Sequence, residues 1–197
     1  MKFRVWLKSR FADKVLLPVR EQIYQLIEPG VSLVDVGCGT GDLLRRTSAK
    51  IKQGVGVDLD AAMIDFANHE NRKLEIDNLE FVCDDATNVL ANKFNVATST
   101  LCLHEMNEVN ARRVFSAMFN NCEKLLIADY AQANSFYAKL GIEFDEFLSG
   151  HYTNYRQYQK RGGIHFYANE IGATIEEIRP SKIDGLTIWV IKGAGAS

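Results

Sequence analysis

The stretch Val34-Asp35-Val36-Gly37-Cys38-Gly39-Thr40-Gly41, VDVGCGTG, decides the fold because it joins an apolar strand to a loop with three glycines. Without a Cβ, a glycine lets the chain turn sharply and lets a ligand touch the main chain. Open α/β folds bind their ligands at the carboxyl ends of strands, where this loop lies. The stretch therefore predicts a ligand site directly after the first strand.

Short, β-branched runs predict buried strands over residues 31–36, 54–58, 79–83, 94–99 and 124–130. Helical segments lie between them: residues 111–118 keep the spacing of one apolar helix face, behind a capping Asn107. Two later runs, 174–178 and 186–191, are too close for a crossover helix and are expected to pair antiparallel. We predict an α/β fold, a Rossmann-like, seven-stranded, mostly parallel sheet with helices on both faces and an antiparallel last strand.

A chain of 197 residues is expected to form one domain, residues 1–197. Its first part contains an apolar stripe on one helix face, formed by Val15, Val19, Ile23 and Leu26. Within the domain we expect an N-terminal helical cap, a cofactor-binding core, an aromatic-rich helical cover and a closing strand pair, at residues 1–30, 31–133, 134–170 and 171–197.

Composition argues against several classes of partner. A net charge of −2 shows no basic excess for nucleic acid. The four cysteines fit no zinc or redox spacing, so we expect reduced thiols and no metal site. The first residues, MKFRVWLKSRFADK, hold no apolar block long enough for a signal peptide or membrane span, so a cytoplasmic location without membrane contact is expected.

The glycine loop departs from two common phosphate-binding patterns. No Gly-Lys-Ser/Thr follows, and Asp42 occupies the place of the third glycine in a dinucleotide fingerprint. Asp35 lies two residues before the loop, where its charge would repel a diphosphate and suits a ligand with positive charge. Asp58 ends the second strand, where a carboxylate can accept hydrogen bonds from both hydroxyls of a ribose.

Four motifs in order, VDVGCGTGDLL, GVDLDAAM, FVCDDA and FNVATSTLCLHEM, resemble those of the class I S-adenosylmethionine-dependent methyltransferases. The resemblance runs from about residue 31 to residue 130, and a reversed last strand is a hallmark of that family's sheet. It implies S-adenosylmethionine as cofactor and S-adenosylhomocysteine as product.

Carried over by position, the resemblance assigns nine residues to the cofactor: Asp35, Gly37, Gly39, Gly41, Asp58, Leu59, Asp85, Ala86 and Thr100. Asp35 and the glycines would surround the methionine part, Asp58 would hold the ribose, and Leu59 would flank the adenine. Asp85 would accept from the adenine amine, beside the main chain of Ala86. Asp84 replaces a frequent glycine, which leaves open which of the two aspartates reaches the base.

After the fourth strand, Ser99-Thr100-Leu101-Cys102 stands in place of the Asn/Asp-Pro-Pro-aromatic signature of enzymes that methylate amino groups of nucleobases or glutamine. That class of acceptor is therefore disfavoured, and a closed, partly apolar pocket formed by the N-terminal helix and the aromatic-rich segment would suit a small molecule. His104 follows and is a candidate base, oriented by Glu105. The alternative is a structural histidine bonded to backbone at a helix start.

Aromatic residues are concentrated between Phe136 and Tyr167, where nine of the chain's twenty occur. His151, Tyr155 and Tyr158 share one face of a predicted helix that Gly162-Gly163 ends. That face either closes over the methyl donor, offering an imidazole or phenol to the acceptor, or packs as ordinary core.

The candidate catalytic residues are therefore His104, Glu105, His151 and Tyr155. We expect transfer of a methyl group from S-adenosylmethionine to an O, N or C nucleophile of a small molecule. A module that binds S-adenosylmethionine without transferring its methyl is the alternative. An NAD-dependent oxidoreductase is disfavoured by Asp35, by the glycine spacing and by the reversed last strand.

Overall fold

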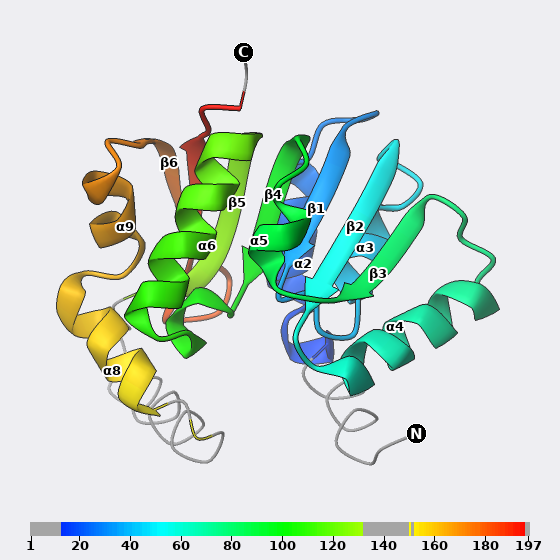
Figure 1. Cartoon of the computed structure of the whole chain (residues 1–197), viewed down its shortest axis with the longest axis horizontal. Coiled ribbons are helices and arrows are strands. Elements are labelled where there is room, and N and C mark those ends of the chain that lie inside the picture. The colour runs from blue at the N-terminus through cyan, green and yellow to red at the C-terminus, as the bar shows by residue number, and fades with distance from the viewer. Residues whose placement is uncertain (1–12, 132–149, 151, 196–197) are drawn as a thin grey trace.

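The computed structural model describes residues 13–131, 150 and 152–195. Its seven strands form one sheet in the order β3-β2-β1-β4-β5-β7-β6 (Figure 1). The strands are β1 (Ser32–Val36), β2 (Gln53–Asp58), β3 (Leu79–Cys83), β4 (Phe94–Thr100), β5 (Cys122–Tyr130), β6 (Thr174–Pro180) and β7 (Leu186–Lys192). The first five run parallel, and β7 pairs antiparallel with both β5 and β6. The predicted fold class is confirmed.

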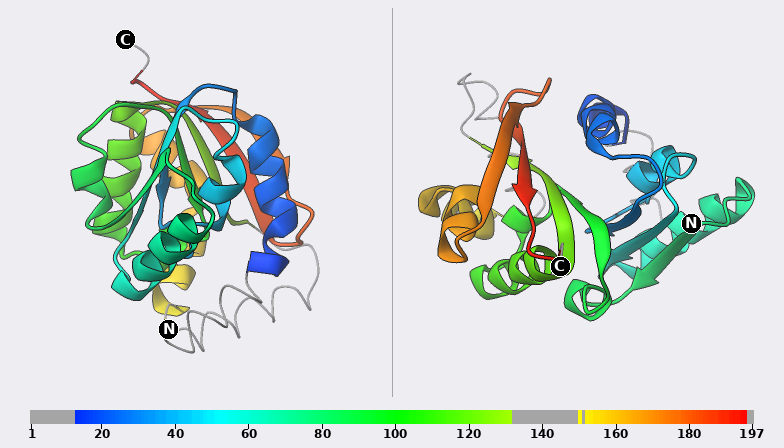
Figure 2. Two further views of the ribbon diagram at one scale, coloured as in Figure 1. Left: turned by 90° about the vertical axis from the view of Figure 1, so that its right-hand side faces the viewer. Right: turned by 90° about the horizontal axis from the view of Figure 1, so that it is seen from above.

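Helices cover both faces of the sheet (Figure 2). One face carries α2 (Leu17–Leu26), α3 (Asp42–Thr47) and α4 (Ala61–Lys73). The other carries α5 (Ala86–Val89), α6 (Glu108–Asn121), α8 (Tyr152–Arg161) and α9 (Ile164–Glu170). A 3₁₀ turn, η1 (Leu103–Glu105), follows β4 and lies under α8. None of the helices within the described ranges is long and apolar enough to cross a membrane.

Local sequence signals set the helix starts. The Asn107 side chain accepts from the Asn110 N–H at 2.9 Å and caps α6, as predicted. The Asp60 side chain accepts from the Ala62 N–H at 2.9 Å and caps α4. The apolar stripe of α6 is buried against the sheet, at Ala111, Val114, Phe115 and Met118. Caps and stripe together fix where α4 and α6 begin and which side of α6 faces inward.

One detail differs from the sequence prediction. Val15 is 54% exposed, so it does not belong to the buried stripe of Val19 and Ile23. The chain turns at Leu16, and α2 begins only after it with Pro18 in its first turn, which breaks the helical register. The reversed strand β7 lies inside the sheet, between β5 and β6.

The parallel register brings the functional residues to one edge of the sheet. Asp35 on β1 is aligned with Thr98 on β4, and Asp58 ends β2. Thr100 ends β4 beside Ala128 of β5. These carboxyl ends lie at the lower side of the sheet in Figure 1.

Candidate active site

The three loop glycines face different surroundings. A Cβ at Gly37 would lie 2.3 Å from the Cys102 sulfur, and one at Gly41 would lie 2.4 Å from the Phe81 ring. Gly39 has nothing within 4 Å of the position that a Cβ would take. Packing therefore requires glycine at the two ends of the loop, whereas Gly39 borders open space where a ligand can approach the main chain.

Asp58 fastens the loop to the end of β2. Its Oδ2 accepts from the Gly39 N–H at 2.9 Å, and its Oδ1 accepts from the Asp60 N–H at 2.9 Å. The next side chain, Leu59, is 77% exposed. A leucine held out at the rim of this loop offers apolar surface to a flat ligand.

Asp35 is a buried carboxylate, 3% exposed, whose Oδ1 accepts from the Thr98 hydroxyl at 2.7 Å. Burial raises the pKa of Asp35 to about 6, while the bond from Thr98 and the charge of Arg20 oppose that rise. Ionising a buried carboxyl group costs free energy, and a cation that binds nearby lowers this cost. The position next to the loop thus suits a positively charged ligand.

The side chains of Asp84 and Asp85 both accept hydrogen bonds from residues of α5. Asp85 caps α5 by accepting from the N–H of Thr87 at 2.9 Å and from its hydroxyl at 2.7 Å, and it also pairs with Arg113. The bond from the Thr87 backbone is the main cause that lowers the pKa of Asp85. Asp84 accepts from the Asn88 amide at 2.9 Å. Both carboxylates lie at the end of β3, where their oxygens can accept further hydrogen bonds.

The end of β4 combines polar groups with backbone strain. Among the described residues, the buried hydroxyl oxygens of Ser99 and Thr100 have no hydrogen-bond partner. Leu101 follows in the left-handed region with φ 52°, which is costly for a residue with a side chain. Its N–H donates to the Ala128 carbonyl at 2.8 Å, which holds the turn. Such strain and unpaired polar atoms concentrate at ligand sites.

His104 and Asp129 form a buried pair where β4 and β5 end. The His104 Nδ1 and the Asp129 Oδ1 are 2.5 Å apart, and the His104 backbone N–H donates to Asp129 Oδ2 at 3.3 Å. A carboxylate at Nδ1 places the imidazole proton there and leaves Nε2 as the proton acceptor. The carboxylate that orients His104 is therefore Asp129, which the sequence analysis missed, where it had named Glu105.

Aromatic rings enclose this pair. The His104 ring centroid lies 4.6 Å from Tyr130, 6.3 Å from Tyr155 and 6.2 Å from Tyr158. The Asn154 amide of α8 donates to the Glu105 carbonyl at 2.7 Å and fastens the helix to η1. Tyr155 thus contacts the predicted base, whereas His151 lies outside the described residues.

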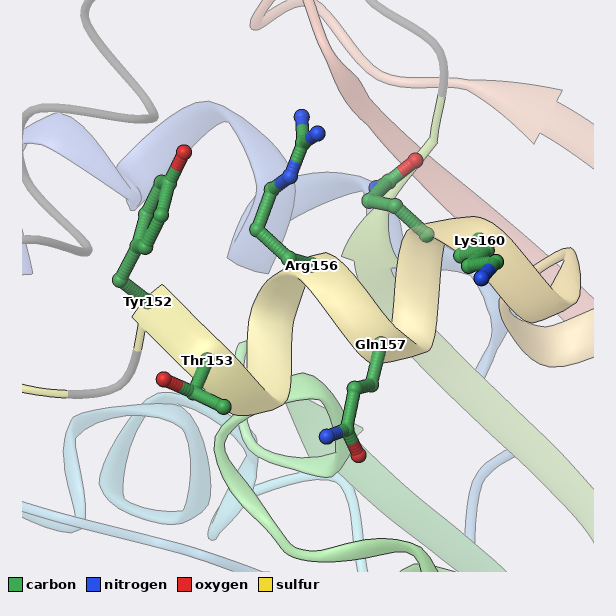
Figure 3. A pocket seen from close by; sticks show the side chains of 6 residues that line it. Tyr152, Thr153, Arg156, Gln157 and Lys160 are labelled. Atoms are coloured by element: carbon green, nitrogen blue, oxygen red, sulfur yellow. The ribbon is translucent and has the colours of Figure 1, made fainter.

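The outer side of α8 borders a hollow of about 660 Å³ (Figure 3). Six side chains line it: Tyr152, Thr153, Arg156, Gln157, Gln159 and Lys160. Tyr152 and Arg156 point to one side of the helix, and Gln157 points to the other (Figure 3). Nitrogen donors predominate in this lining, which suits ligands that carry oxygen acceptors.

Residues 33–124 match a family model described as a methyltransferase domain. Over these residues the sequence is similar to methyltransferase domains. The strand order and the reversed β7 agree with the resemblance to the class I methyltransferases. The comparison with curated proteins returned no sequence that matches.

Solved structures of methyltransferases share the fold. The pyocyanin biosynthetic protein PhzM aligns with a TM-score of 0.69 and 15% identity, over 93% of this chain and 56% of its own. An S-adenosylmethionine-dependent methyltransferase from Aquifex aeolicus aligns with a TM-score of 0.63 and 14% identity, over 97% of this chain and 100% of its own. The O-methyltransferase NcsB1 was solved with S-adenosylmethionine and 2-hydroxy-5-methyl naphthoic acid. It aligns with a TM-score of 0.61 and 16% identity, over 82% of this chain and 48% of its own.

The chain spans about half of the length of PhzM and of NcsB1, and NcsB1 was solved with S-adenosylmethionine. The site fits this cofactor in three observed respects. Gly39 borders open space, Leu59 is exposed beside the loop, and the Thr100 hydroxyl is buried without a partner among the described residues. No group of three His, Cys, Asp or Glu side chains within those residues is suited to a metal ion.

Proposed function

We propose that this protein transfers the methyl group of S-adenosylmethionine to a small molecule whose nucleophile arrives protonated, with His104 as the base. The observation that carries the proposal is the buried His104–Asp129 pair, with 2.5 Å between Nδ1 and Oδ1, at the carboxyl ends of β4 and β5. An acceptor hydroxyl needs such a base, whereas a neutral amine does not.

The cofactor residues follow from the site. We assign Asp58 to the ribose hydroxyls, Leu59 to the adenine face and Asp35 to the positive charge of the methionine part. Gly39 would give the cofactor access to the main chain, because nothing lies within 4 Å of its missing Cβ. The end of β3 would supply the acceptor for the adenine amine, beside the main chain of Ala86.

Of that assignment, the adenine contact is the part with two candidates. Asp85 is bonded to Thr87 and paired with Arg113, and Asp84 is bonded to Asn88. A carboxylate with two oxygens accepts further bonds beside those it already has. We keep Asp85 as the proposed acceptor because it directly precedes Ala86 and the start of α5.

The chemistry divides between cofactor and chain. The cofactor supplies a methyl group already activated by a sulfonium, and leaves as S-adenosylhomocysteine. His104 Nε2 takes the acceptor's proton as the new bond to the methyl carbon forms, and Asp129 stabilises the imidazolium through Nδ1. The aromatic rings of Tyr130 and Tyr155 exclude water from the pair.

A small-molecule acceptor is supported by one comparison. NcsB1, which shares the fold, was solved with a naphthoic acid.

A second candidate function is binding of S-adenosylmethionine without transfer. It is favoured by the burial of His104, whose side chain is only 1% exposed. Base catalysis requires α8 to move away from η1 when the acceptor binds, whereas a binding module requires no such movement.

One experiment separates these candidates. The purified protein is incubated with methyl-labelled S-adenosylmethionine and a metabolite extract, in parallel with His104→Asn and with His69→Asn, an exposed histidine on α4. We expect a labelled product with the wild type and His69→Asn, and at least a hundredfold less with His104→Asn. Absence of product despite cofactor binding would favour the binding module, and full activity of His104→Asn would refute the base.

A further inference from the structure

A buried charge cluster ties the chain before α2 to the glycine loop. Arg20 on α2 is 8% exposed, and its Nη1 donates to Asp13 Oδ1 at 2.7 Å and to Asp42 Oδ2 at 2.9 Å. The other oxygen of Asp13 accepts from the Thr40 hydroxyl at 2.9 Å. Thr40 is buried and lies between Gly39 and Gly41 in the loop.

The loop is thereby held from two sides. Asp58 accepts from the Gly39 N–H, on the side of β2. Asp13 accepts from the neighbouring Thr40 side chain, on the side of α2, and the Thr40 carbonyl accepts from Arg45 Nη1 at 2.6 Å. Glycine leaves a backbone its greatest freedom, and all three loop glycines have positive φ. These bonds restrict a segment that its own sequence leaves mobile.

Burying these charges costs desolvation free energy, so the cluster is not expected to add much to the free energy of unfolding. A buried arginine with two carboxylates must recover the loss of their hydration, and apolar side chains of similar volume often pack as well or better. What such a cluster provides is one defined geometry, because Arg20 Nη1 and the Thr40 hydroxyl each have fixed carboxylate acceptors. Here the fixed element is Thr40, at the centre of the cofactor loop.

We propose that Asp13, Arg20 and Thr40 form a latch that holds the glycine loop in the shape that binds the cofactor. They are positioning residues, since they act through the loop backbone. The inference rests on the proposed function in so far as that assigns this loop to S-adenosylmethionine. A loop already ordered before binding does not lose conformational freedom when the cofactor binds, so affinity rises.

The Thr40 hydroxyl offers a near-isosteric test. Thr40→Val keeps the shape of the side chain and removes its donor, whereas Thr40→Ser keeps the donor. We expect Thr40→Val to raise the Kd for S-adenosylhomocysteine about tenfold in calorimetry, and Thr40→Ser to stay within about threefold of wild type. The matched control is Ser48→Ala, which removes a hydroxyl bonded to the Arg45 carbonyl away from the loop.

A double-variant cycle shows whether the bond to Asp13 carries the effect. Asp13→Ala and Thr40→Val each remove the same bond, so the double variant should bind no more than about twofold more weakly than Asp13→Ala alone. The latch would be refuted if the fold-changes in Kd of the two single variants multiplied in the double variant, or if Thr40→Val left the Kd unchanged.

Amide hydrogen exchange of the cofactor-free protein gives a readout that does not depend on binding. In Thr40→Val the amides of Gly39 and Gly41 should exchange at least fivefold faster than in Thr40→Ser, while those of β1 stay unchanged. If wild type binds no S-adenosylhomocysteine, the proposed function and the cofactor role of the latch both fail. If wild type binds and Thr40→Val neither loosens the loop nor weakens binding, only the latch fails.

Discussion

Replacing Asp35 by Asn should make the cofactor-free protein more stable and its cofactor binding weaker. The carboxylate is buried, and its pKa lies at about 6 in the folded protein against the ordinary 3.8. That difference means that ionising Asp35 in the folded state lowers the free energy of unfolding by about 3 kcal/mol at neutral pH. Asn keeps an oxygen that accepts from the Thr98 hydroxyl, and it carries no charge.

The direction of this pKa difference determines how the free energy of unfolding changes with pH. As pH rises, the unfolded chain loses its Asp35 proton near pH 4, and the folded chain loses it only near pH 6. Between these values the free energy of unfolding of wild type falls, because ionisation favours the unfolded state. We expect Asp35→Asn to exceed wild type by about 3 kcal/mol at pH 7.5 and by about 1 kcal/mol at pH 4.5.

Urea unfolding of the cofactor-free protein at both pH values measures this difference. Asp65→Asn, an exposed carboxylate on α4, is the matched control and should change stability by less than about 0.5 kcal/mol. Calorimetry at pH 7.5 should show at least tenfold weaker S-adenosylmethionine binding by Asp35→Asn. An Asp35→Asn protein that is no more stable than wild type at pH 7.5, or equally stabilised at both pH values, would refute the reasoning.

Three further predictions concern the same edge of the sheet. Asp58→Ala should weaken S-adenosylhomocysteine binding about tenfold to a hundredfold in calorimetry, because a charge-assisted hydrogen bond contributes about 1.5–3 kcal/mol; unchanged affinity would exclude the proposed ribose role. Gly37→Ala should lower the Tm more than Gly39→Ala, because only at Gly37 would a Cβ meet the Cys102 sulfur, at 2.3 Å; equal losses in thermal unfolding would contradict this. His104→Asn should abolish the acidic limb of the pH–rate profile, and a profile that keeps that limb would assign it to another group.

Much of the fold could be predicted because its signals are local. The β-branched runs mark the strands, and Asn107 and Asp60 each cap a helix through a bond to a residue two or three positions away. The short connection between β6 and β7 permits only antiparallel pairing. The stripe prediction was wrong at Val15 because the turn at Leu16 shifts the helical register, and the sequence signal for this break is Pro18 in the first turn of α2.

The acceptor side was harder because its contacts are distant in sequence. Asp129 is 25 residues from His104, so spacing along a helix or strand does not connect them. A signal was nevertheless present, since Asp129 lies in an otherwise apolar run, and a buried carboxylate needs a partner. Glu105 is adjacent to His104 in sequence, but neighbouring side chains in a turn point in different directions, and the carboxylate at His104 Nδ1 is that of Asp129. The hydrogen bond between Asp13 and Thr40 also joins residues that are distant in sequence, so no local spacing predicts it.

The place of β7 between β5 and β6 bears on how the nascent chain matures on the ribosome. The strands that carry the glycine loop, Asp58 and Asp129 are all synthesised before β7, yet the outer edge of β5 has no strand beside it until β7 emerges. Most of β5 is apolar and buried in the finished sheet. Until β7 is synthesised, the unpaired edge of β5 is therefore exposed to chaperones and to other nascent chains. Translation speed over the segment that precedes β7 should therefore influence the yield of native protein.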